Sequence, residues 1–225
     1  MVKTAILVSG GGTNLQAIID AKLDASMSDV IKNCDFTVIS SHPEAYAIQR
    51  AEKAQIPVHI VDKTAFTTRT AFTDAIVEKL RDLKIDLVVY AGFKYILEPP
   101  MTETYRNRII NIHPSLIPSF CGMGYYGLKV HEAVLAHGVK ITGATAHFVT
   151  EITDDGPIIL QKAVPVLEGD TPLTLQRRVM EEAEWIILPQ AISLFCEGRL
   201  EVKGRVVHIR EQASSIYNLQ LTIND

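Results

Sequence analysis

The segment NIHPSLIP, which begins at Asn111, carries an amide and an imidazole two positions apart. Alternate residues of a β-strand point to the same side of a sheet. A strand over 108–112 would therefore project Asn111 and His113 together at its carboxyl end, where open α/β sheets bind ligands. An amide can stabilise developing negative charge, and an imidazole can transfer a proton near neutral pH. Pro114 and Pro118 exclude a continuing helix, and we expect them to hold an extended exit beside the site.

A carboxylate is the third group that this chemistry requires. Asp154 lies in the acidic turn TDDG, between two segments that are expected to form neighbouring strands. A carboxylate beside an imidazole fixes its orientation and favours its charged form, which makes a proton donor. We therefore infer a catalytic set of Asn111, His113 and Asp154, in which Asn111 helps to hold an oxyanion. The competing interpretation is that His113 serves the structure only, as most histidines do.

A glycine-rich loop, SGGGTN over 9–14, separates the first expected strand from the first expected helix. Free backbone N–H groups and the positive end of a helix favour an anion at such a loop. It is not a dinucleotide-binding fingerprint, because Leu15 stands where the third glycine is required. It is not a Walker loop, because no Gly-Lys-Ser/Thr sequence follows. The loop fits the single phosphate of a sugar phosphate, and the alternative is a tight turn that only caps the helix.

Three other kinds of site are disfavoured by the residues present. The segment HEAVLAH, from His131 to His137, places its two histidines on different faces of a helix, so a metal site is not expected. No GxSxG motif exists to seat an α/β-hydrolase nucleophile. Cys121 could act as a nucleophile, but a free thiol in a glycine-rich loop is more often incidental.

Short β-branched runs followed by helical spacing recur along the first half of the chain. Strands are expected over 4–9, 35–40, 57–61, 85–92 and 108–112, with helices over 10–21, 43–54 and 70–83 between them. Such alternation implies right-handed crossovers. The fold class predicted is therefore α/β, a doubly wound and mostly parallel sheet with helices on both faces.

The pattern changes in the second half of the chain. Segments 140–150 and 157–166 are longer and alternate apolar with polar residues, which is typical of antiparallel strands or of an edge addition to the sheet. A long helix is expected next, opened by Thr171 as N-cap and closed by Gly198. One last strand is predicted over 200–209.

Composition and charge restrict the class of protein. The 225 residues suit one sizeable domain, and we expect 1–225 to form a single one. A net charge of −4 provides no basic surface for nucleic acid. No stretch of about 18 apolar residues exists, so no membrane association is expected. Cys34, Cys121 and Cys196 are scattered and odd in number, which argues against a disulfide framework and zinc sites and favours the cytoplasm.

Five motifs, taken together and in order, carry a resemblance to a known family. SGGGTNLQAIIDA, AGFKYIL, NIHPSLIPSFCG, GATAHFVTEITDDGPIILQ and EWIILP resemble the phosphoribosylglycinamide formyltransferase family, over residues 3 to 202 approximately. The resemblance implies the Rossmann-like formyltransferase fold. It also implies transfer of a formyl group from the cosubstrate 10-formyltetrahydrofolate to the amine of glycinamide ribonucleotide, in purine biosynthesis. No tightly bound cofactor and no metal are expected, and the protein would be a monomer or a homodimer.

The resemblance also assigns roles to individual positions. The catalytic set inferred above matches the family's catalytic residues. Four positions match a phosphate loop and a glutamate that holds the ribose hydroxyls of the ribonucleotide: Gly12, Thr13, Asn14 and Glu184. Six positions match the folate site: Arg69, Lys94, Tyr95, Ile96, Leu97 and Asn111. Over 94–97 it is the backbone that would embrace the pterin. Without the resemblance, Glu184 would be interpreted as an exposed helix acid.

The chain departs from the family pattern at two places that matter for the site. AGFKYIL carries Tyr95 where the family commonly has the arginine of AGFMRIL, so backbone recognition is retained while the arginine side chain is absent. The acidic turn reads Asp-Asp-Gly where Asp-Gly-Gly or Asp-Thr-Gly is usual. Either Asp154 or Asp155 could therefore face His113, and alignment to the HFVT motif favours Asp154.

Two other functions stay open at the level of the sequence. A formyltetrahydrofolate hydrolase, or deformylase, could use the same three catalytic residues with water as the nucleophile. The glycine loop argues against it, since water needs no phosphate site. A folate-binding or nucleotide-binding module without catalytic activity is the non-enzymatic alternative.

Overall fold

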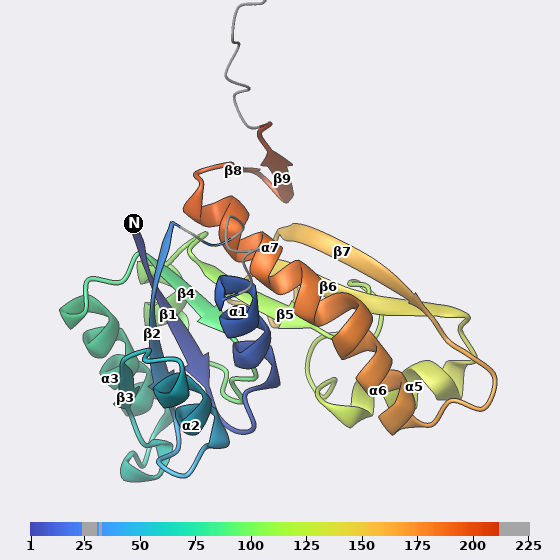
Figure 1. Ribbon diagram of the computed structural model, residues 1–225, viewed down its shortest axis with the longest axis horizontal. Helices are drawn as coiled ribbons and strands as arrows, with labels where there is room; N and C mark the ends of the chain where they lie inside the picture. Colours follow the sequence, from blue (N-terminus) through green and yellow to red (C-terminus); the bar gives the residue numbers. More distant parts are fainter. Residues whose placement is uncertain (24–30, 32, 212–225) are drawn as a thin grey trace, which may run out of the picture.

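The computed structural model describes residues 1–23, 31 and 33–211. Their strands form one nine-stranded sheet in the order β3-β2-β1-β4-β5-β6-β7-β9-β8 (Figure 1). The α/β class predicted from the sequence is confirmed. The sheet divides into a parallel half, built from the first five strands, and a mainly antiparallel half that follows.

The parallel half contains the five strands that the alternating pattern predicted. They are β1 (Val2–Val8), β2 (Cys34–Ser40), β3 (Val58–Ile60), β4 (Leu87–Tyr90) and β5 (Ile109–His113). The helices between them are α1 (Thr13–Leu23), α2 (Tyr46–Lys53), α3 (Arg69–Asp82) and α4 (Pro99–Thr104), with a short 3-10 turn at Lys63–Ala65. β1 pairs with both β2 and β4, so the strand order reverses beside it. That reversal opens a crevice at the carboxyl ends of the strands.

The second half confirms the antiparallel addition and corrects one element. β6 (Ile141–Phe148) pairs antiparallel with β5, and β7 (Ile158–Pro165) pairs antiparallel with β6. The single strand predicted over 200–209 is wrong, because the chain reverses at Gly204. It forms a hairpin of β8 (Leu200–Lys203) and β9 (Val206–Ile209), and β9 joins β7 in parallel.

The long C-terminal helix is interrupted within its length. Thr171 caps its start as predicted, by accepting a hydrogen bond from the N–H of Thr174. The helix then runs as α6 (Pro172–Val179), a π-helical turn at Met180–Glu184, and α7 (Trp185–Cys196). Such π turns recur at functional sites, because the added residue redirects the side chains around it. The remaining helix, α5 (Leu128–His137), lies between β5 and β6 in the chain.

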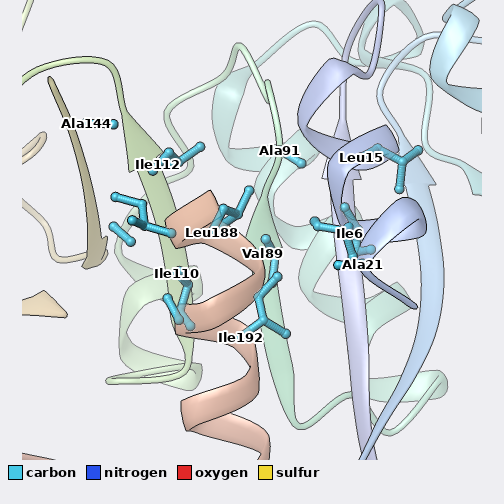
Figure 2. Packing of buried hydrophobic residues seen from close by; sticks show 14 of the residues in the cluster. Ile6, Leu15, Ala21, Val89, Ala91, Ile110, Ile112, Ala144, Leu188 and Ile192 are labelled. Carbon is cyan, nitrogen blue, oxygen red and sulfur yellow. The ribbon is translucent and has the colours of Figure 1, made fainter. Parts of the chain in front are cut away.

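Two apolar cores cover the two faces of the sheet. One core joins α1 and α7 to β1, β4 and β5, and the other joins α3 and α4 to the opposite face. Figure 1 shows α1 and α7 crossing the same face. In Figure 2, Leu188 and Ile192 of α7 lie over Val89 of β4 and Ile110 of β5. α7 is therefore fixed against the strands that carry the candidate site.

The expectation that the cysteines stay unpaired is wrong for two of them. Cys34 and Cys196 form a disulfide, with a Cα–Cα distance of 6.1 Å, and Cys121 is free. The two residues are 162 positions apart in the sequence. They meet because Cys196, at the end of α7, lies beside Thr4 of β1, and β1 pairs with β2, whose first residue is Cys34. Spacing along the chain gave no indication of this contact. In the described ranges, no helix is both long and apolar enough to cross a membrane.

The packing of α7 leads to a prediction about stability. Leu188 is fully buried against the sheet, so Leu188→Ala removes apolar contacts and leaves a cavity. We expect the free energy of unfolding to fall by about 2–5 kcal/mol in urea denaturation. The matched control is Leu173→Ala on α6, whose side chain is 64% exposed and should cost at most about 0.5 kcal/mol. Equal losses in the two variants would contradict the packing described.

Candidate functional site

The pairing of β5 with β6 assembles the first part of the site. Asn111 and His113 lie on the same side of β5, as the alternation predicted, and Asn111 stands directly opposite His147 of β6. The Asn111 Nδ2 lies 3.2 Å from the His147 Nε2. The structure therefore adds His147 to the expected set. It was missed because its signal, a polar residue facing Asn111 across two strands, appears only once the strand register is known.

His113 is held between a carboxylate and a backbone carbonyl. Its Nδ1 lies 3.4 Å from the Asp154 Oδ2, and its Nε2 lies 2.9 Å from the carbonyl oxygen of Phe120. The side chains of His113 and Asp154 are only 5% and 9% exposed. Both ring nitrogens therefore face oxygen atoms, and the Phe120 carbonyl, which can only accept, takes a hydrogen bond from Nε2.

The turn that follows β5 differs from the extended exit expected from the two prolines. The chain after His113 does not become helical, but it curls back, so that the Phe120 carbonyl covers the imidazole. Side chains from β6 and β7 hold this turn. Thr145 donates to the Ser115 carbonyl at 2.6 Å, and Gln161 donates to the Ile117 carbonyl at 3.0 Å. Each proline fixes φ, but contacts from neighbouring strands decide the path.

The acidic turn places Asp154, and not Asp155, against His113. Asp154 has a φ of +55°, a strained conformation for a residue with a side chain, and accepts a hydrogen bond from the N–H of Gly122 at 3.0 Å. Asp155 points elsewhere and pairs with Arg205 at 2.9 Å. A Cβ added to Gly156 would overlap the Phe148 carbonyl, so this glycine allows the turn to lie directly on β6.

Burial and hydrogen bonding determine the charge of the His147 ring and which of its nitrogens carries the proton. Its Nδ1 lies 2.9 Å from the Phe148 carbonyl, which can only accept, so Nδ1 carries the proton. Burial lowers the pKa of His147, although the Phe148 bond and the Asp154 charge oppose the shift. The ring is therefore neutral near pH 7, and its Nε2 accepts from the Asn111 amide. This contact orients Asn111 with its carbonyl oxygen and second N–H left for other partners.

The glycine loop lies at the carboxyl end of β1, on the same edge of the sheet as the carboxyl end of β5. Gly12 has a φ of +71°, and a Cβ there would come within 2.7 Å of the Ala47 Cβ on α2. Packing against α2 is thus a sufficient reason for that glycine. Gly11, in contrast, faces open space. The first N–H groups of α1, which starts at Thr13, have no partner within the helix.

Asn14 connects the loop to the π turn of the C-terminal helix. Its Nδ2 donates to the Glu184 Oε2 at 2.9 Å, and its own Oδ1 is buried with no partner among the described residues. Glu184 is 7% exposed, which overturns its interpretation as an exposed helix acid. Burial raises the pKa of Glu184 to about 7, against the opposing effect of the Asn14 bond. The π turn gives this carboxyl group its position next to α1.

The residues expected to bind folate are only partly brought together. Lys94 donates its backbone N–H to the Ser9 Oγ at 3.0 Å, which ties the 94–97 segment to the glycine loop. The Tyr95 hydroxyl lies 2.7 Å from the His42 Nε2. Within the same segment Ile96 is 43% exposed and Leu97 is buried. Arg69 is exposed at the start of α3, and no hydrogen bond links it to the catalytic cluster in the described structure.

An open cavity of about 530 Å³ borders the glycine loop. Gly10 and Gly11 line one part of it, and His42, Tyr46 and Asp62 line others. None of the catalytic set lines this cavity, whose walls come from the segments that follow β1, β2 and β3. A ligand can therefore reach the glycine loop directly, whereas the His113 side chain is only 5% exposed.

The remaining candidates play no part in this cluster. His131 is fully buried on α5, and burial lowers its pKa to about 4, whereas His137 bonds the Ala133 carbonyl on the exposed side. Among the described residues, no three His, Cys, Asp or Glu side chains are grouped as metal ligands. The Cys121 thiol has its pKa raised, chiefly by burial and further by the Asp154 and Asp155 charges, which disfavours a thiolate nucleophile.

Known proteins resemble the chain over most of its length. A family model described as formyl transferase matches residues 2–192. The phosphoribosylglycinamide formyltransferase of Haemophilus influenzae is 38% identical over 95% of this chain and 96% of its own length. A trifunctional purine biosynthetic protein from Bos taurus is 42% identical over 93% of this chain, which spans only 20% of that protein. The solved structure of glycinamide ribonucleotide transformylase 1 from Symbiobacterium toebii has a TM-score of 0.84 and 45% identity, covering 94% and 95% of the two chains.

The raised pKa of Glu184 leads to a prediction about stability and pH. The Glu184 carboxyl group retains its proton up to about pH 7 in the folded state, whereas in the unfolded chain it releases the proton near the usual pKa of 4.5. This group therefore makes the protein less stable as pH rises from about 4.5 to 7, by up to about 3 kcal/mol. Glu184→Gln cannot titrate. Between pH 5 and pH 8 we expect it to gain stability relative to wild type in urea denaturation.

A neighbouring carboxylate supplies the control for this measurement. Glu181 lies on the exposed side of the same π turn and pairs with Arg177 at 2.8 Å. Glu181→Gln should keep the pH dependence of the wild type. A Glu184→Gln variant whose stability tracked the wild type at every pH would show that Glu184 does not hold its proton as described.

Proposed function

Because the chain belongs to the formyl transferase family, we propose that it transfers a formyl group from 10-formyltetrahydrofolate to the amine of 5-phosphoribosylglycinamide, in de novo purine biosynthesis. The observation that carries this proposal is the joining of two features at one edge of the sheet. One is the cluster of Asn111, His113, His147 and Asp154, and the other is the glycine loop. The other activities of the trifunctional relatives are not carried over, because this chain spans about a fifth of their length.

The reaction begins when the amine attacks the formyl carbon of the folate. The carbonyl oxygen then becomes an oxyanion on a tetrahedral carbon. Asn111 supplies a preoriented N–H to this oxyanion, because its other N–H is bound by His147. A donor of this kind typically contributes about 100-fold to 1000-fold in rate. The carbon–nitrogen bond to the folate breaks next, and the released nitrogen needs a proton.

His113 is the proposed source of that proton and a second donor to the oxyanion. Asp154, at 3.4 Å from Nδ1, orients the ring and stabilises its charged form. The Nε2 proton is bound to the Phe120 carbonyl in the structure. The substrate must therefore displace this carbonyl, so the turn over 119–122 acts as a lid that opens when substrate enters. The amine loses a proton in the same cycle, which restores His113.

The ribonucleotide is proposed to lie along the glycine loop and α1. The N–H groups of Gly12, Thr13 and Asn14 would hold its phosphate at the positive end of the helix. Glu184 would accept hydrogen bonds from the ribose hydroxyls. The unpartnered Oδ1 of Asn14, which lies next to Glu184, offers one further acceptor for a hydroxyl group.

The folate is proposed to lie along the segment from Lys94 to Leu97, bound mainly by its backbone. Asn111 reaches the formyl group, and Arg69, which is exposed, suits the acidic tail of the folate. Tyr95 does not replace the arginine that the family usually carries, since its hydroxyl group is bound to His42.

Four further properties complete the proposal. The formyl folate is a cosubstrate, and no tightly bound cofactor is required. The partners are small molecules, with neither nucleic acid nor membrane among them. Residues 1–225 form a single domain that works as a monomer or a homodimer. The cytoplasm stays the proposed compartment, although the Cys34–Cys196 bond removes the cysteine argument for it.

The hydrolase alternative differs in the nucleophile that the same cluster would serve. Water needs no phosphate site, yet the glycine loop stands open to a cavity of about 530 Å³. A loop of this kind favours the phosphorylated acceptor over water.

The proposal predicts that turnover of 10-formyltetrahydrofolate depends on glycinamide ribonucleotide. Absorbance of the folate product should change only when both substrates are present. Asp154→Asn should lower kcat about 100-fold or more, because the neutral amide cannot stabilise the charged His113 ring. Asp155→Asn is the matched control, since Asp155 pairs with Arg205 away from the cluster.

Three outcomes would contradict the proposal. Equal release of formate without the ribonucleotide would identify a deformylase. Folate binding with neither transfer nor hydrolysis would favour a binding module. Similar losses in Asp154→Asn and Asp155→Asn would remove the catalytic role of Asp154.

The contact between His147 and Asn111 predicts a role in positioning. His147→Leu removes the acceptor that orients the amide, and we expect kcat to fall about 10-fold or more, with little change in either KM. His147→Gln, whose carbonyl oxygen can accept from Asn111, should recover part of the loss. If the Leu and Gln variants were equally impaired, the orienting hydrogen bond would not be the reason for the effect.

A further inference from the structure

Lys94 extends its side chain over the glycine loop, although the resemblance assigned this residue to folate. Its Cε and Nζ both lie 3.9 Å from the point that a Cβ on Gly10 would occupy. In the part of the chain that the structure describes, no carboxylate pairs with the Lys94 ammonium. An uncompensated cation therefore stands over the loop that is proposed to hold a phosphate.

The backbone beneath Lys94 is held from both ends. The Ser9 Oγ accepts from the Lys94 N–H at 3.0 Å, and Ser41 in turn donates to the Ser9 Oγ at 2.8 Å. One residue later, the Tyr95 ring packs edge-on against the Phe72 ring, with 5.4 Å between the ring centroids. The Tyr95 hydroxyl oxygen lies 2.7 Å from the His42 Nε2. These contacts fix the backbone from which the Lys94 side chain reaches Gly10.

A second cation supports the loop from its other side. The Arg50 Nε donates to the Gly11 carbonyl at 2.8 Å, and its guanidinium also donates to Gln16 on α1 at 2.7 Å. The Arg50 guanidinium therefore already bonds the loop and α1, whereas the Lys94 ammonium is available to a ligand. The cavity beside the loop also contains the carboxylates of Glu44 and Asp62. Neither Lys94 nor Arg50 lines that cavity, and their positive charge lies against the loop itself.

We propose that the Lys94 side chain is a phosphate-binding group for the ribonucleotide, in addition to the backbone of the glycine loop. This inference deepens the proposed function and rests on it for the identity of the acceptor. An ammonium complements a dianionic phosphate as a point charge and completes the site that the N–H groups of α1 begin.

The test is binding of ribose 5-phosphate, measured by calorimetry on the whole protein without folate. Lys94→Met keeps the length of the side chain and removes its charge, and we expect the Kd to rise about 10-fold or more. Lys94→Arg should stay within about 3-fold of wild type. Lys162→Met, on an exposed part of β7, removes one charge elsewhere and should leave the Kd unchanged. Thermal unfolding of each variant shows whether it has kept its fold.

Measurements of turnover distinguish failure of this inference from failure of the proposed function. Lys94→Met should raise the KM for glycinamide ribonucleotide and leave the KM for formyl folate unchanged. A rise in the folate KM alone would assign the side chain to folate and overturn the inference. So would wild-type binding of ribose 5-phosphate by Lys94→Met, an equal loss in Lys162→Met, or no binding by the wild type. A wild type that binds ribose 5-phosphate but transfers no formyl group would refute the proposed function alone.

Discussion

The antiparallel register between β5 and β6 is the constraint on which the candidate site depends. It sets Asn111 opposite His147, and β6 leads directly into the turn that carries Asp154 back to His113. A shift of one residue would send every side chain of one strand to the other face. Gly156 contributes to the same geometry, since only a residue without a side chain lets the turn lie against the Phe148 carbonyl. The chemistry of the site is therefore a property of two paired strands and one tight turn.

Burial tunes two ionisable groups of the site in opposite directions for one physical reason. Loss of water disfavours charge, so it lowers the pKa of His147 and raises that of Glu184. The neutral His147 ring can accept a hydrogen bond from Asn111, which a charged ring could not. Glu184 holds a proton up to about pH 7 and accepts a hydrogen bond from Asn14. Neither arrangement maximises stability, which is typical of residues selected for a site.

The two halves of the site differ in access. The glycine loop borders an open cavity, whereas a turn covers the His113 ring with the Phe120 carbonyl. In the loop, the φ of Gly12 and its closeness to Ala47 already require glycine at that position. Lys94 and Arg50 add positive charge on two sides of that loop. The glycine loop is thus open to a ligand, whereas the His113 ring is covered in the structure.

Residue types and local periodicity by themselves determined the α/β class, the strand that carries Asn111 and His113, and the glycine loop before the first helix. These follow from short-range geometry, since strand alternation and free helix N–H groups need no distant partner. Other features were decided only by the tertiary structure: the neutral His147, the buried Glu184, the Cys34–Cys196 bond and the turn over His113. Each of them joins residues from separate elements. Burial, strand register and contacts between residues far apart in the sequence arise only when the sheet and its helices pack. No local pattern in the sequence therefore predicts them.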